Sequence, residues 1–137
     1  MSVKGSCDCK GVVFELSGEL RDVVFCHCSQ CRKTSGHFWA ATQVLRDNLN
    51  FIKASSLSWY DSSDKARRGF CNRCGSSMFY ERKGVDKISI AAGTLEAPTF
   101  LDQMRHIYVA SKGDYYDISD NLPKFEEYCD LGMPLKL

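Results

Sequence analysis

The sequence has no long apolar stretch and no strong excess of charge of either sign. None of its apolar runs approaches the roughly 18 residues that a transmembrane helix requires. The first residues, MSVKGSCDCKG, contain nothing like the apolar core of a signal peptide. Eighteen basic and seventeen acidic residues give a formal net charge of +1, so general attraction to a polyanion is not expected. We therefore expect a cytoplasmic protein with no membrane or nucleic-acid partner, in a compartment where thiols stay reduced.

The sequence also lacks internal repeats, low-complexity tracts and segments with the composition of a linker. Its 137 residues are enough for one domain with a sizeable core. The hydrophobic content of 44% and the charged content of 26% are ordinary for a globular protein. We expect a single domain spanning residues 1–137.

Short segments rich in Val, Ile, Phe, Tyr and Trp run along most of the chain, and many alternate apolar with polar residues. Turn signals such as Ser17-Gly18 and Lys83-Gly84 separate them. The pattern predicts a mainly antiparallel β protein, with helical turns only at Ser29–Ser35, ended by Gly36, and around Leu122–Tyr128. The predicted strands are Val12–Leu16, Val23–Cys26, Trp39–Val44, Leu49–Ile52, Leu57–Tyr60, Arg68–Phe70, Met78–Tyr80, Ile88–Ala92 and Ile107–Val109.

Cysteine, in contrast, is abundant, with eight residues in the chain. They occur as Cys7 and Cys9; Cys26, Cys28 and Cys31; Cys71 and Cys74; and Cys129 alone. In a secreted protein eight cysteines could form about 105 disulfide patterns, but a disulfide within one of these close pairs would close a strained ring. Close pairs separated by long stretches suit zinc, because each pair supplies two thiolates from one turn. We therefore favour zinc over a disulfide framework.

Seven of the cysteines divide into a group of four and a group of three. A structural zinc takes four ligands, whereas a working zinc keeps one position open. The triplet Cys26, Cys28 and Cys31 is compact enough to hold one ion by itself. The closed site would then be formed by Cys7, Cys9, Cys71 and Cys74. Its second half, CNRCG, has the form of a zinc knuckle, in which the glycine tolerates a positive φ; the alternative is an unrelated pair of buried cysteines.

Three histidines leave alternatives open. His27 is either a fourth ligand of the triplet or a histidine hydrogen-bonded elsewhere, since a residue between two ligands on an extended segment tends to point away from the metal. His106 is a second candidate, as a distal ligand or as an acid–base group. His37 is expected to be structural, and Cys129 is expected to have no role in either site.

Polar and basic residues near the triplet are candidates for substrate contact. Arg32 and Lys33 could meet a substrate carboxylate or could simply be solvated. Thr34 and Ser35 could bond a substrate or close the helical turn. Three basic residues precede the knuckle, namely Lys65, Arg67 and Arg68. We interpret this run as the solvent face of a strand rather than as a nucleic-acid site.

These motifs, taken together, resemble those of the glutathione-dependent formaldehyde-activating family, also known as the centromere protein V-like family. The resemblance covers nearly the whole chain and rests on the order and spacing of five stretches: GSCDC, CHCSQCRKTSG, FCNRCGS, AGTL and ISDNLP. The sequence departs from the family pattern at Lys10, where glycine is common, and at Tyr115 or Tyr116, where tryptophan is common. Neither position is a proposed ligand, so the metal assignment is unchanged; the departures bear instead on the shape of a substrate pocket, and hence on which substrate it would take.

The resemblance implies a β-tent fold like that of a small zinc-binding Rab chaperone, in which several small coiled antiparallel sheets are stitched by zinc. It implies two zinc ions per chain, held by the same groups of four and three cysteines. It further implies a carbon–sulfur lyase-type enzyme that adds a thiol, in this family glutathione, to formaldehyde or a related aldehyde. The candidate substrate contacts are Lys33, Ser35 and His106.

A zinc bound by three thiolates is nominally anionic and a poor Lewis acid. Stabilising an incoming thiolate is therefore a better physical fit than polarising the aldehyde oxygen. The competing interpretation is a non-catalytic binding module in which both zinc ions are structural.

Overall fold

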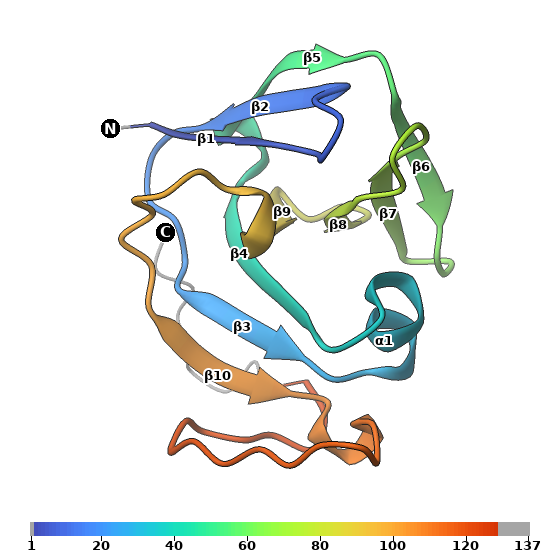
Figure 1. The fold of residues 1–137 in the computed structure, drawn as a ribbon, viewed down its shortest axis with the longest axis vertical. Coiled ribbons are helices and arrows are strands. Elements are labelled where there is room, and N and C mark those ends of the chain that lie inside the picture. Colours follow the sequence, from blue (N-terminus) through green and yellow to red (C-terminus); the bar gives the residue numbers. More distant parts are fainter. Residues whose placement is uncertain (1, 129–137) are drawn as a thin grey trace.

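The computed structural model describes residues 2–128, and most of its regular structure is β-strand (Figure 1). The predicted mainly β class is confirmed. A small sheet contains β1 (Val3–Ser6), β2 (Val12–Leu16) and β5 (Leu49–Ala54). A larger sheet contains β3 (Val23–Cys26), β4 (Trp39–Leu45), β6 (Leu57–Asp61), β7 (Ala66–Cys71), β8 (Ser77–Arg82), β9 (Lys87–Ala91) and β10 (Gln103–Ile107). The helical elements are α1 (Ser29–Ser35) and the 3-10 turns η1 (Arg46–Asn48), η2 (Ala92–Thr94) and η3 (Val109–Ser111).

The strands of the small sheet follow the order β1-β2-β5, and those of the large sheet follow the order β10-β3-β4-β9-β8-β7-β6. Within residues 2–128, no helix has the length and apolar composition needed to span a membrane.

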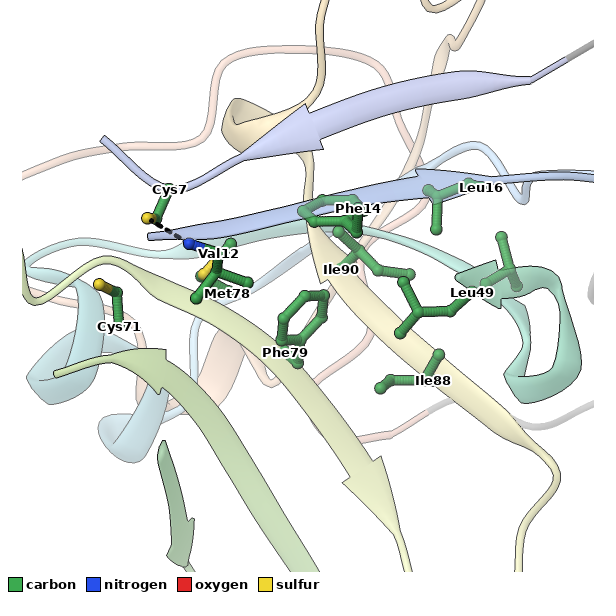
Figure 2. Close-up of a cluster of buried hydrophobic side chains, with 11 residues drawn as sticks. Cys7, Val12, Phe14, Leu16, Leu49, Cys71, Met78, Phe79, Ile88 and Ile90 are labelled. Atoms are coloured by element: carbon green, nitrogen blue, oxygen red, sulfur yellow. Dashed lines mark hydrogen bonds between the residues drawn. The ribbon is translucent and has the colours of Figure 1, made fainter. Parts of the chain in front are cut away.

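The core lies where the small sheet packs on the middle of the large one (Figure 2). Phe14 of β2 meets Phe79 of β8 edge to face, with ring centroids 5.3 Å apart. Both rings are fully buried, and burying an aromatic or aliphatic side chain of this size contributes roughly 1.5–3 kcal/mol. Cys7 and Cys71 belong to the same buried cluster, so the first cysteine group is held at one end of the core.

One strand pair departs from the expected antiparallel pairing. β10 runs parallel to β3, with His106 opposite Phe25 and Ile107 opposite Cys26. Figure 1 shows the two strands side by side below β4. The pairing brings a late strand of the chain alongside the strand that leads into the cysteine triplet.

The helix predicted around Leu122–Tyr128 is wrong, because that segment lies extended along β10. His106 donates its backbone N–H to Pro123 at 2.9 Å, and Phe125 donates its own to the His106 carbonyl at 3.0 Å. A helix would need those backbone groups for its own hydrogen bonds. We call residues 118–128 the C-terminal strap.

Several strand ends differ by one to a few residues from the prediction, and two strands differ more. β1 was not expected from the sequence, and the strand expected at Ile107–Val109 begins and ends earlier, as β10. Val109 begins the 3-10 turn η3 instead. Cys129 lies outside the described residues.

Candidate metal centres

The four cysteines predicted to form a closed site come together from two turns. Cys7 and Cys9 follow β1, and Cys71 ends β7, with Cys74 in the turn that follows it. Their sulfur atoms all lie within 4.8 Å of one another. The Cys9 sulfur lies 3.7 Å from that of Cys7 and 3.6 Å from that of Cys71. We call these residues the four-cysteine group.

These distances fit a tetrahedral metal ion. With zinc–sulfur distances of about 2.3 Å, neighbouring sulfurs of a tetrahedral site lie about 3.8 Å apart. Hydroxyl groups also favour the thiolate form that a metal requires: the Ser56 hydroxyl lowers the pKa of Cys71 to about 7, and the Ser76 hydroxyl lowers that of Cys74 to about 5. The group can therefore hold a metal ion and is compatible with zinc.

The knuckle turn, residues 71–75, has a backbone geometry that suits metal binding by its two thiols. The backbone N–H of Cys74 points at the Cys71 sulfur at 3.4 Å, and Gly75 adopts a left-handed φ of 80°. The N–H of Val12 makes the corresponding contact with the Cys7 sulfur at 3.3 Å. Each of these donors is an uncharged backbone amide.

The remaining three cysteines form a second group at the start of α1, which we call the three-cysteine group: Cys26, Cys28 and Cys31. Cys28 is the N-cap of α1, and its sulfur accepts the backbone N–H of Cys31 at 3.2 Å. Hydrogen bonds with the Cys26 and Cys31 thiols lower the pKa of Cys28, while hydrogen bonds with Cys28 and Cys31 raise the pKa of Cys26. The three sulfurs also lie within 4.8 Å of one another, so this group can hold a metal ion as well.

Arg68 lies against the three-cysteine group, which makes the solvent-face interpretation wrong for this residue. Its guanidinium Nη2 donates to the Cys31 sulfur at 3.5 Å, and its Nε donates to the Gln30 side-chain oxygen at 3.0 Å. It is only 6% exposed. Successive strand residues point to opposite faces, so two adjacent arginines on β7 cannot both face solvent. Arg67 is the outward one, and it pairs with Glu81.

None of the three histidines belongs to either cysteine group. His27 is fully buried and points away from the sulfurs, with its Nε2 2.8 Å from His106 Nδ1 and its Nδ1 2.6 Å from the Tyr116 hydroxyl. His106 Nε2 in turn lies 2.8 Å from a carboxylate oxygen of Asp120. Burial lowers the pKa of His27 to about 4, so its ring is neutral near pH 7.

With the Asp120 carboxylate ionised and both imidazole rings neutral, the chain of contacts from Tyr116 to Asp120 has one hydrogen-bond arrangement that satisfies every partner. His106 donates from Nε2 to Asp120, His27 donates from Nε2 to His106, and Tyr116 donates its hydroxyl proton to His27. The side chain of His27 is thus fixed at both ends. Because His27 lies between Cys26 and Cys28, this chain also positions the segment that carries two of the thiols.

Two hollows are lined by residues that neighbour the three-cysteine group in the sequence, and none of its three cysteines lines either of them. One, of about 420 Å³, is lined by small glycine and alanine residues together with five hydroxyl-bearing residues and an indole, from Thr34, Ser35, Ser76, Ser77, Thr94 and Trp39. Trp39 also packs in the buried cluster that contains Cys31. None of the described residues that line this cleft carries a charge. The other hollow, of about 250 Å³, is lined by His27, His106 and Tyr116 among others.

The three candidate substrate contacts are therefore not brought to one place. Ser35 lines the larger cleft, and its hydroxyl donates to the Cys31 carbonyl at 2.7 Å. His106 lines the smaller hollow. Lys33 is exposed on α1 and lines neither of the two.

Comparison with known proteins identifies a family whose model matches most of the chain. The family model described as glutathione-dependent formaldehyde-activating enzyme matches residues 2–111. The matched range contains both cysteine groups, and it ends before Tyr116 and Asp120.

Two curated relatives match over most of their length. A Schizosaccharomyces pombe protein named as an uncharacterized lyase is 24% identical over 124 residues, which are 89% of this chain and 89% of the relative. A Halomonas elongata protein bearing the name "Putative glutathione-dependent formaldehyde-activating enzyme" is 26% identical over 144 residues, covering 98% of this chain and 90% of the relative. Among solved structures, that of a Rhodobacter sphaeroides protein superposes with a TM-score of 0.59 and 28% identity, covering 69% of this chain and 88% of that one.

Proposed function

The chain belongs to the glutathione-dependent formaldehyde-activating enzyme family, and on that premise we propose that it is a zinc-dependent carbon–sulfur lyase-type enzyme. Its reaction would join a thiol, glutathione or a similar peptide thiol, to formaldehyde or a related aldehyde. The sulfur forms a bond to the carbonyl carbon, the carbon–oxygen π bond breaks, and the thiol proton ends on the oxygen.

One observation carries this proposal: the three-cysteine group gathers three thiols with no fourth Cys, His, Asp or Glu ligand from residues 2–128. The four-cysteine group, in contrast, has a full set. When bound to the three cysteines, zinc would supply an open coordination position at which a substrate thiol is stabilised as the thiolate.

The protein's own residues supply a place for the rest of the substrate. Trp39 lines the larger cleft and packs in the same cluster as Cys31, so one wall of the cleft contacts that cluster. Hydroxyl groups from α1, the knuckle turn and η2 line it, and such groups suit the amides of a peptide thiol. Lys33, on the exposed side of α1, remains our candidate for a carboxylate of glutathione.

The test is exchange spectroscopy by NMR on glutathione and formaldehyde, with and without zinc-replete protein. We expect the protein to accelerate interconversion with S-(hydroxymethyl)glutathione, and Cys28→Ser to abolish the acceleration while remaining folded. If zinc-replete protein fails to accelerate exchange for every pair of thiol and aldehyde tested, the protein is instead a binding module with two structural metal ions.

A further inference from the structure

Arg68 brings a charge to only one of the two cysteine groups. Within residues 2–128 it is the only charged side chain that hydrogen-bonds a sulfur atom, at 3.5 Å from Cys31. The sulfurs of the four-cysteine group receive backbone amides and the hydroxyls of Ser56 and Ser76, which are neutral. The two groups therefore differ in charge as well as in ligand count.

The guanidinium of Arg68 is buried without a carboxylate partner. The residue is 6% exposed, and no Asp or Glu of residues 2–128 forms an ion pair with it. A buried cation is costly unless an anion lies nearby. The sulfur atoms of the three-cysteine group are the candidates for that anion, because Arg68 contacts Cys31 directly.

Its position is also fixed. The Gln30 side-chain oxygen holds Nε at 3.0 Å, and the guanidinium lies 5.0 Å from the ring centroid of Tyr80 and 5.8 Å from that of Trp39. Cation–π contacts of this kind orient an arginine without neutralising it. The charge is therefore held in place beside the thiols.

A divalent ion with three thiolates has a net single negative charge, and the positive charge of Arg68 balances it. We infer that Arg68 gives the three-cysteine group its preference for an anionic fourth ligand, so that the group accepts a thiolate from outside the chain in preference to a neutral donor. The inference rests on the proposed function only in taking a thiolate as the incoming ligand. Arg68 acts through Cys31 and is thus a positioning residue.

The test measures ligand binding rather than turnover. Protein carrying zinc in the four-cysteine group and cobalt(II) in the three-cysteine group is titrated at one fixed pH with 2-mercaptoethanol and, separately, with imidazole, following the visible absorption of cobalt. The variants are Arg68→Gln and Arg68→Lys. Arg67→Gln is the matched control, because it removes a neighbouring arginine that faces Glu81 instead.

In Arg68→Gln we expect the affinity for the thiol to fall by about tenfold or more, because a nearby unit positive charge that attracts the thiolate is lost, while the affinity for neutral imidazole stays unchanged. Arg67→Gln should match the unmodified protein for both ligands. An equal fall for both ligands in Arg68→Gln, or no fall for the thiol, would overturn the inference.

Arg68→Lys keeps the inference testable if Arg68→Gln does not fold. Lysine retains the charge, so the preference for thiol over imidazole should persist even where both affinities decrease. Loss of that preference in folded Arg68→Lys would also overturn the inference. Protein that shows the preference and lacks catalysis would contradict only the proposed function.

Discussion

Among single residues, His27 shows how the segment between two metal-binding thiols is held. Its ring is fully buried and contacts Tyr116 and His106 rather than the sulfurs. Side chains alternate along an extended segment, which predicts that His27 points away from a metal bound by Cys26 and Cys28. The prediction applies because β3 ends at Cys26 in an extended conformation. The partners of His27 lie 79 and 89 positions away, so no local pattern could identify them.

The hydroxyl of Tyr116 offers a test of this arrangement. Tyr116→Phe removes the 2.6 Å contact and leaves His27 Nδ1 without its donor. Because His27 is buried, we expect the free energy of unfolding to fall by about 1–3 kcal/mol.

Tyr115→Phe is the control, since Tyr115 is 63% exposed and its hydroxyl meets His37 at the surface. Thermal unfolding of both zinc-replete variants gives the comparison. An equal loss in the two variants would contradict a special role for Tyr116.

Among the elements, α1 depends on the residue that ends it. Gly36 has a left-handed φ of 89°, and its N–H closes the helix on the Arg32 carbonyl at 2.8 Å. Gly36→Ala should destabilise the protein by about 1 kcal/mol, because a side chain is strained at that φ although the surrounding space is open.

Gly93→Ala is a matched control, because Gly93 also has open space around it and lacks a positive φ. We expect its unfolding midpoint to stay near that of the unmodified protein. If Gly93→Ala costs as much as Gly36→Ala, the left-handed cap is not the cause of the loss.

The elements also show where sequence reasoning succeeds and where it fails. β2 and α1 match their predicted bounds. The apolar–polar alternation of β2 and the glycine that ends α1, Gly36, are local signals, and the folded protein does not override them. β1 is not predicted, since Lys4, Gly5 and Ser6 have weak strand propensity and form a strand only by pairing with β2.

Long-range contacts account for the remaining differences. The C-terminal strap is extended because β10 and the turn that follows it take up its backbone hydrogen bonds, which the composition of the strap does not reveal. Similarly, alternation shows that one of Arg67 and Arg68 must face inward, but only the folded sheet shows that Arg68 does so, beside Cys31. The clustering of the seven cysteines into two groups could be predicted, because their spacing in the chain already separates close pairs from distant ones.

For the whole molecule, the two cysteine groups predict the metal content. Metal analysis of protein purified without chelator should approach two zinc ions per chain. Mild chelation should remove one ion first, since the three-cysteine group supplies one ligand fewer. A reproducible value near zero, with disulfides between these cysteines, would contradict the zinc assignment.

The two groups should also differ in their effect on folding. Cys9 and Cys71 are 62 positions apart, so a metal that joins them closes a long loop and restricts the unfolded chain. Structural zinc contributes on the order of 10 kcal/mol in small zinc-finger peptides, against a typical total stability of about 5–15 kcal/mol. Cys74→Ser should therefore give insoluble or molten protein.

Cys28→Ser disrupts only a short local site, and we expect a folded domain with one zinc. Zinc content and thermal unfolding of the two variants, measured side by side, provide the check. Unfolded Cys28→Ser together with a tolerated Cys74→Ser would show that the roles of the two groups are reversed.

The distant partners of His27 have a consequence for the order in which a newly made chain matures. A ribosome adds about 5–20 residues per second from the N-terminus onward, and early segments can fold before later ones exist. All four members of the four-cysteine group have been synthesised once Cys74 is added, whereas Tyr116 and Asp120 come tens of residues later. The nascent chain can thus bring the four-cysteine group together while the segment around His27 still lacks its support, so we expect the three-cysteine group to take its final shape after the four-cysteine group.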